Sequence, residues 1–146
     1  MIINKLHIYL AEDDQDDRLF FKEVFTTLKM DYELIMCEDG LKLLESLKTA
    51  AILPHIIFLD LSMPGKDGLE CLTEIKKDSR LKDITVAIYS SSAASRQDEM
   101  FLAGANVYIK KQNDIENLRK ILSEVIYINW QYITDGMDKE SFMLNY

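Results

Sequence analysis

Short runs of apolar residues alternate along this chain with longer segments in which apolar residues recur every three or four positions. A short, continuous apolar run is typical of a strand buried in a sheet, and the wider spacing is typical of a helix with one buried face. The predicted strands are Leu6–Ala11, Tyr32–Cys37, Ile56–Leu59, Ile84–Tyr89 and Val107–Lys110. A helix is predicted after each strand. The pattern therefore predicts an α/β fold of type (βα)5, a doubly wound five-stranded parallel sheet with helices on both faces.

The third predicted strand leads into the most informative stretch of the sequence, IIFLDLSMPGKDG. The strand residues Ile56–Leu59 are followed at once by one carboxylate, Asp60, and then by a loop that contains Pro64, Gly65 and Gly68. Open α/β sheets bind ligands at the carboxyl ends of their strands. Asp60 is therefore predicted to lie in the functional site.

Other polar residues follow other strands at the same edge of the sheet. Glu12 and Asp13 follow the first strand, Ser90 the fourth, and the Lys110–Lys111 pair closes the fifth. Clustered carboxylates repel one another unless a cation joins them, and oxygen ligands suit a hard ion such as Mg²⁺, with Mn²⁺ as an alternative. A lysine and a hydroxyl add donors for an anion. Metal, anion and carboxylate together predict an aspartyl-phosphate site with Asp60 as the nucleophile.

Three further acids, Asp14, Asp16 and Asp17, stand between this acidic pair and the first predicted helix. Acidic side chains in a first helical turn favour the helix macrodipole, and an aspartate can cap the free N–H groups. We therefore assign these three acids to the start of the helix and not to the site.

Length and charge narrow the class of protein. The 146 residues suit one domain with an ordinary core, and the net charge of −8 argues against nucleic acid as a direct partner. No apolar run approaches the roughly 18 residues of a membrane span, and the first residues lack the features of a signal peptide. Cys37 and Cys71 have no dense cysteine framework around them and are predicted to be free thiols in a reducing compartment. A cytoplasmic protein with no membrane partner is expected.

Over roughly residues 5–127, the sequence resembles the receiver domains of two-component response regulators, which share the fold of the chemotaxis regulator CheY. The motifs that carry the resemblance are the acidic pair Glu12–Asp13 and the segments FLDLSMPGKDG, IYSSSA and GANVYIKK, in the family's order. The resemblance implies the flavodoxin-like strand order 2-1-3-4-5. Residues 128–146 are expected to form a C-terminal extension, partly helical or a tail, with no output domain.

The resemblance also implies roles for the acidic residues. Asp60 would accept a phosphoryl group from a phosphohistidine on a sensor histidine kinase or a phosphotransfer protein. Asp13, Asp60 and the backbone carbonyl of Ser62 would bind the metal ion directly, and Glu12 would act mainly through metal-bound water. The protein would assist its own phosphorylation and dephosphorylation but would not otherwise be an enzyme.

The remaining roles concern the response to phosphorylation. Lys111 would bind a phosphoryl oxygen, Ser90 would move toward the phosphoryl group, and Tyr108 would turn inward with it. For Tyr108, a plain structural role as an aromatic residue of an edge strand is the alternative. The new charge would shift the population of a two-state surface that binds a downstream protein target.

The sequence departs from the family's pattern after the lysine, where Gln112 stands in place of the usual proline. A cis bond before a non-proline residue costs about 2.5–4 kcal/mol, so we consider a trans bond that places Lys111 differently. Lys110 is the alternative to Lys111 if the register shifts by one. The small side chains of Ser62 and Ser92 predict a site open to water, which would favour fast hydrolysis of the phosphorylated form.

Three other functions are weighed against the receiver. A degenerate receiver that only binds partner proteins is kept open by Gln112. A phosphatase of the haloacid dehalogenase type would need a second aspartate two residues after Asp60, where Ser62 stands. A flavodoxin-like cofactor binder would need a loop rich in Ser, Thr and Gly after the first strand, where Glu12 and Asp13 stand.

Overall fold

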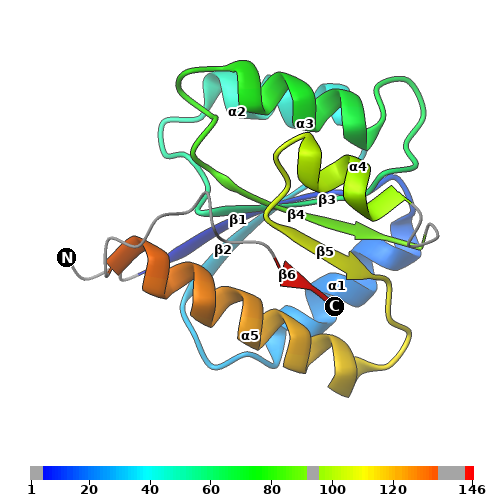
Figure 1. Ribbon diagram of the computed structural model, residues 1–146. Coiled ribbons are helices and arrows are strands. Elements are labelled where there is room, and N and C mark those ends of the chain that lie inside the picture. Colours follow the sequence, from blue (N-terminus) through cyan, green and yellow to red (C-terminus); the bar gives the residue numbers. More distant parts are fainter. Residues whose placement is uncertain (1–4, 92–95, 135–143) are drawn as a thin grey trace.

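The computed structural model describes residues 5–91, 96–134 and 144–146, and it contains a parallel sheet with helices on both faces (Figure 1). The strands are β1 (Leu6–Ala11), β2 (Tyr32–Cys37), β3 (Ile56–Leu59), β4 (Thr85–Ser90), β5 (Val107–Lys110) and β6 (Leu144–Asn145). The helices are α1 (Gln15–Thr26), α2 (Gly40–Thr49), α3 (Gly68–Lys77), α4 (Gln97–Leu102) and α5 (Ile115–Thr134). The predicted alternation of five strands and five helices is confirmed.

The strands lie in the order β2-β1-β3-β4-β5-β6, which confirms the order expected for the first five. All neighbouring strands pair in parallel. Ala11 stands opposite both Cys37 and Leu59, so β1, β2 and β3 end at one level. The carboxyl ends of the strands therefore form a common edge, as the parallel arrangement requires.

The sheet separates two apolar layers, one beneath α2, α3 and α4 and one beneath α1 and α5 (Figure 1). The strand β3 is buried on both faces: Ile57 and Leu59 belong to the first layer, and Ile56 and Phe58 belong to the second. This two-sided burial explains why its sequence is a continuous apolar run. None of the helices in the described part of the chain combines the length and the hydropathy needed to cross a membrane.

Aspartates begin the three helices that follow the first three strands. Each side chain accepts a hydrogen bond from the backbone N–H of the third residue of its helix, which satisfies a donor that has no partner within the helix. The pairs are Asp14 with Asp17, Asp39 with Lys42, and Asp67 with Glu70. In α1 this cap fixes the first helical turn directly behind Glu12 and Asp13.

The C-terminal part of the chain goes beyond the predicted pattern. The helix α5 continues without a break through Tyr127 to Thr134. The short strand β6 then adds a sixth strand beside β5, where the sequence predicted five. The backbone N–H of Tyr146 donates to the carbonyl of Tyr108 at 2.8 Å, and that of Lys110 donates to the carbonyl of Tyr146 at 3.0 Å. Backbone bonds of this kind need no apolar periodicity, so the sequence pattern does not predict this strand.

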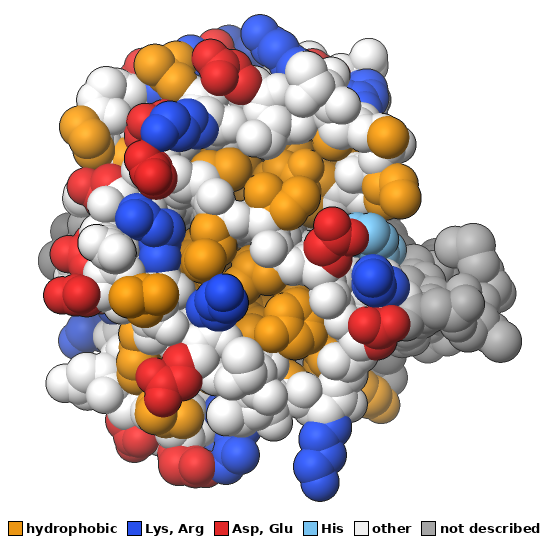
Figure 2. Space-filling view, turned by 180° about the vertical axis from the view of Figure 1, so that it is seen from behind, with side chains coloured by type: hydrophobic (Ala, Val, Ile, Leu, Met, Phe, Trp, Pro, Cys, Tyr) orange, Lys and Arg blue, Asp and Glu red, His pale blue; other side chains and the backbone are white. Residues whose placement is uncertain are grey.

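The opposite edge of the sheet is formed by β2, which lies behind β1 in Figure 1. Seen from behind, hydrophobic side chains gather in the middle of the molecule and charged side chains surround them (Figure 2). In β2, half-buried and exposed residues alternate, and Ile35 is 37% exposed. This alternation is what a strand at the margin of the sheet produces, in contrast to the uniform burial of β3.

Candidate functional site

Backbone hydrogen bonds bring the ends of neighbouring strands together. The N–H of Asp60 donates to the carbonyl of Ala11 at 3.0 Å, which fixes the end of β3 against β1. The N–H of Lys111 donates to the carbonyl of Ser90 at 2.9 Å, which fixes the end of β5 against β4. Five of the residues that the sequence analysis places at this edge therefore lie at the ends of these strands: Glu12, Asp13, Asp60, Ser90 and Lys111.

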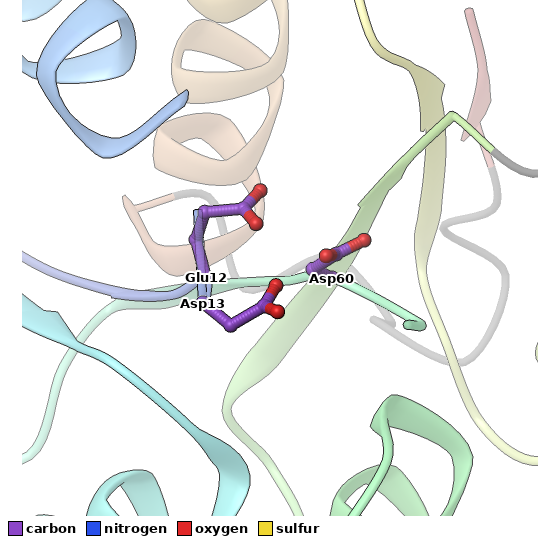
Figure 3. Close-up of side chains that lie close together, drawn as sticks. All are labelled: Glu12, Asp13 and Asp60. Carbon is purple, nitrogen blue, oxygen red and sulfur yellow. The ribbon is translucent and has the colours of Figure 1, made fainter. Parts of the chain in front are cut away.

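Three carboxylates form an acidic cluster at the ends of β1 and β3 (Figure 3). One oxygen each from Glu12, Asp13 and Asp60 lies within 4.8 Å of the other two. Glu12 is 1% exposed and Asp60 is 4% exposed, whereas Asp13 faces solvent. The cluster is therefore open to small ions on the side of Asp13 and closed to water behind Glu12.

The ammonium group of Lys111 lies beside this cluster. Its Nζ atom is 2.6 Å from Oε1 of Glu12, 2.8 Å from Oδ2 of Asp17 and 3.7 Å from Oδ2 of Asp60. Within the described residues, Oε1 of Glu12 has no other partner. The lysine therefore compensates a buried carboxylate that would otherwise be isolated.

The positive charge of Lys111 does not fully offset the burial of the two acids. Burial raises the pKa of Glu12 from its ordinary 4.5 to about 7, although the hydrogen bond from Lys111 acts to lower it. Burial also raises the pKa of Asp60, and the Lys111 charge and a hydrogen bond from the Ser62 backbone act against that rise. A raised carboxyl pKa means that the ionised forms lack stabilisation in this site.

The donor set fits a divalent metal ion. The cluster consists only of carboxylate oxygens, which are ligands that hard cations prefer, and one ammonium group serves three carboxylates. A bound divalent cation would supply the missing positive charge and lower the pKa values of Glu12 and Asp60. Glu12, Asp13 and Asp60 are therefore the residues that would hold such an ion.

Without metal, the protein is expected to be less stable at about pH 8 than at about pH 5. The pKa of Glu12 is about 7 in the folded protein, against an ordinary value of 4.5. Between these values, the folded protein holds a proton that the unfolded chain has lost. The free energy of unfolding therefore falls as the pH rises through this window, by at most about 3 kcal/mol. Thermal unfolding in the presence of EDTA measures the effect.

Two comparisons control this prediction. Glu12→Gln has no carboxyl group to titrate, so its melting temperature should change much less across the same pH window. Magnesium should stabilise the wild type more at the alkaline end than at the acidic end, because it binds the ionised carboxylates. A melting temperature in EDTA that rises with pH across this window would contradict the assignment.

The other predicted site residues lie around the acidic cluster. Ser90 is buried at the end of β4, and Tyr108 is 2% exposed in the apolar layer beneath α2, α3 and α4. Burial raises the pKa of Tyr108. Ser62 is exposed, and Ser92 lies outside the described residues. The roles of Ser90, Tyr108 and Ser62 stay predictions.

Of the two adjacent lysines, Lys111 lies at the acidic cluster, whereas the side chain of Lys110 is exposed. The described residues contain no cis peptide bond, so the bond between Lys111 and Gln112 is trans. Lys111 thus reaches the acids from a loop with a trans bond at this position. The amide side chain of Gln112 donates to the carbonyl of Lys110 at 2.9 Å and closes this turn.

Two residues at the site were missed by the sequence analysis. Asp17, which we assigned to the helix start, bonds to Lys111. Tyr89 has its ring centroid 5.9 Å from Nζ of Lys111, and burial raises its pKa to about 12. The signal available for Asp17 was its place in the first turn of the helix that follows Glu12 and Asp13, which keeps it near the same edge of the sheet.

The chain is similar to known proteins in both sequence and fold. Residues 8–123 match the family model of the response regulator receiver domain. The response regulator Rcp1 of a Synechocystis species is 32% identical over 126 residues, which cover 81% of this chain and 84% of Rcp1. The crystal structure of Mn²⁺-bound Rcp1 has a TM-score of 0.73 at 32% identity and covers 82% of this chain and 91% of that one.

A second solved structure is similar over a longer part of the chain. The phosphorylated cyanobacterial phytochrome response regulator RcpA has a TM-score of 0.76 at 28% identity. The likeness covers 90% of this chain and 96% of that one. Both sequence and fold therefore match proteins of the same class.

Proposed function

This chain belongs to the response regulator receiver domain family, and from that premise we propose that Asp60 is its phosphoacceptor. The observation that carries the proposal is the meeting of Asp60 with Glu12, Asp13 and Lys111 at one edge of the sheet. A nucleophilic carboxylate, a site for a divalent cation and a fixed ammonium group are the parts that phosphoryl transfer to an aspartate needs. We take the ion to be Mg²⁺, with Mn²⁺ as an alternative.

In the proposed reaction, a carboxylate oxygen of Asp60 attacks the phosphorus of a phosphohistidine. A P–O bond forms, the P–N bond breaks, and its electron pair stays on the imidazole nitrogen. Water later attacks the phosphorus, which releases inorganic phosphate and restores the carboxylate. Asp13, Asp60 and the Ser62 carbonyl would hold the metal ion, and Glu12 would act mainly through metal-bound water. The ion would supply charge compensation for the transferred oxygens.

Three residues respond to the negative charge of the phosphoryl group. A phosphoryl group adds about −1.5 to −2 charge at Asp60. Lys111 donates to one of its oxygens, and Ser90 at the end of β4 supplies a hydroxyl donor. Tyr108, three residues before Lys111 on β5, changes its packing as β4 and β5 adjust. The surface formed by α4, β5 and α5 thereby switches between two states.

The partners follow from this chemistry. The donor is a sensor histidine kinase or a phosphotransfer protein, and the switched surface binds a downstream protein target. The net charge of −8 disfavours direct binding to nucleic acid. We place the protein in the cytoplasm, with residues 5–127 as the receiver and residues 128–146 as an extension of it. In this proposal the protein assists its own phosphorylation and dephosphorylation and has no other enzymatic activity.

The test is phosphorylation of the purified protein with acetyl phosphate. The bond between phosphorus and the acetyl oxygen breaks, and acetate leaves. With Mg²⁺ present, intact-mass measurement should show an adduct of one phosphoryl group, and peptide mapping should locate it at Asp60. EDTA should abolish the adduct because the carboxylates then lack their cation.

Two outcomes would count against the proposal. An adduct located on another residue would show that Asp60 is not the acceptor. A protein that takes up no phosphoryl group from acetyl phosphate, phosphoramidate or a phosphorylated kinase would be a degenerate receiver that acts only by binding partners.

A further inference from the structure

We propose that Asp17, in the first turn of α1, is a positioning residue for Lys111. It holds the ammonium group away from Asp60 in the resting protein and competes for it with a phosphoryl group. The inference rests on the proposed function, since it concerns the lysine that would bind the phosphoryl oxygen. It gives Asp17 a role in the site itself, in addition to its place in the first turn of α1.

The contact between the two side chains is direct. Nζ of Lys111 donates to Oδ2 of Asp17 at 2.8 Å, whereas the same nitrogen is 3.7 Å from Oδ2 of Asp60. In this structure the lysine hydrogen-bonds to the helix acid, whereas its contact with the proposed acceptor is a longer ion pair. The two residues are 94 positions apart, so the contact links the start of α1 to the loop between β5 and α5.

The position of Asp17 is set by a closed ring of interactions. The N–H of Asp14 donates to Oε2 of Glu12 at 3.2 Å, and the N–H of Asp17 donates to Oδ1 of Asp14 at 3.0 Å. Lys111 then joins Asp17 back to Oε1 of Glu12, 2.6 Å away. Each carboxylate in the ring is fixed by a neighbour. Asp17 is therefore presented to the lysine by the cap of its own helix.

The ring creates a competition for the donors of Lys111. An ammonium group has three N–H donors. One donates to Asp17, and the same nitrogen forms an ion pair with Glu12 at 2.6 Å. The side chain of Glu12 is 1% exposed, whereas that of Asp17 is 42% exposed. Releasing Asp17 to water costs less than leaving Glu12 buried and unpaired. Asp17 is therefore the partner that Lys111 gives up when a phosphoryl oxygen arrives.

The ionisation of the lysine agrees with this arrangement. Burial acts to lower the pKa of Lys111, yet the pKa is raised, and the hydrogen bond to Asp17 is the largest of the contributions that raise it. Asp17 therefore helps to hold Lys111 in its ammonium form. Loss of Asp17 should weaken this hold without removing the lysine.

The first test uses beryllofluoride, a non-covalent mimic of the phosphoryl group, with Mg²⁺ and intrinsic fluorescence as the readout. Asp17→Asn should bind it about two- to five-fold more tightly than the wild type, because a half-exposed acid no longer competes for Lys111. Asp16→Asn is the matched control. It makes the same charge change one residue away, Asp16 is exposed, and it pairs with no basic side chain within the described residues.

A double-mutant cycle separates competition for the lysine from a general effect of charge. In a Lys111→Met background, Asp17→Asn should no longer alter beryllofluoride affinity. Equal effects of Asp17→Asn and Asp16→Asn would overturn the proposal. So would weaker binding by Asp17→Asn, or an effect that survives without Lys111. A purely structural role of Asp17 would lower the melting temperature and would not depend on Lys111 in this way.

A second readout does not require the protein to be phosphorylated. In nitrogen-detected NMR of the metal-free protein, the ammonium protons of Lys111 should exchange with water faster in Asp17→Asn than in the wild type, with no such change in Asp16→Asn. An unchanged exchange rate would overturn the proposal even if the protein folds normally. A wild type that binds no beryllofluoride and takes up no phosphoryl group would refute the proposed function, and the NMR result would still decide on the pair.

Discussion

Asp60→Asn is expected to lose the phosphoryl adduct completely and, in EDTA, to melt at a higher temperature than the wild type. The amide of asparagine matches the carboxylate in shape but is a far weaker nucleophile, so no P–O bond forms. The stability should rise because burial raises the pKa of Asp60, which means that the ionised side chain is stabilised less in the fold than in water. Intact mass and thermal unfolding measure the two effects.

Magnesium should change the difference in melting temperature between the wild type and Asp60→Asn. In the wild type the ion should recover the stability that the ionised cluster lacks, so the difference from Asp60→Asn should shrink as Mg²⁺ is added. Asp16→Asn, which changes an exposed acid outside the cluster, should keep both the adduct and the wild-type response to Mg²⁺. An adduct that persists in Asp60→Asn would move the acceptor to another carboxylate, with Asp13 as the nearest alternative.

Gly68→Ala is expected to destabilise the protein and to slow its phosphorylation. A Cβ atom at Gly68 would lie 2.4 Å from the carbonyl oxygen of Asp60 and 2.8 Å from Cα of Leu61. Both are backbone atoms, so the strand end that carries Asp60 must move. Alanine at a helical position gains roughly 1 kcal/mol in propensity, but overpacking of this kind costs about 1–3 kcal/mol and occasionally more. The clash therefore outweighs the gain.

The matched control for Gly68→Ala lies three residues earlier, in the loop before α3. Gly65 has a φ of 76°, and a Cβ atom added there would meet no heavy atom within 4 Å, so Gly65→Ala strains only its own backbone, by about 1–2 kcal/mol. Its phosphorylation rate per folded molecule should stay close to that of the wild type. Chemical denaturation and the initial rate with acetyl phosphate compare the two variants. Equal phosphorylation rates in both would show that the contact with the Asp60 carbonyl has no effect on the acceptor.

The sequence was informative where burial imposes a regular pattern. The strand β3 is buried on both faces, so every residue of Ile56–Leu59 is apolar and the strand could be located to the residue. The parallel arrangement followed from alternation with helices, and the parallel arrangement alone placed Glu12, Asp60 and Lys111 at one edge. Placing these residues required no knowledge of side-chain packing, because the ends of parallel strands lie at the same edge of the sheet.

Contacts that depend on side-chain direction could not be obtained in this way. Asp17 was assigned to the helix start, since an acid in a first turn is explained by capping and by the macrodipole. Its contact with Lys111 depends on the helix's orientation against a loop 94 positions away. The strand β6 was missed for a different reason: it is held by backbone bonds to Tyr108 and Lys110, which any residue type can make.

The hydrogen bonds between Tyr146 and β5 also bear on where an affinity tag should be attached. Residues fused after Tyr146 would start beside the carbonyl of Tyr108 and the N–H of Lys110, next to the strand that leads to Lys111. Lys5 precedes β1 and lies at the far end of that strand from Glu12. An affinity tag placed ahead of β1 therefore leaves the molecule away from the acidic cluster, whereas a bulky fusion at Tyr146 would strain the sheet margin that adjoins it.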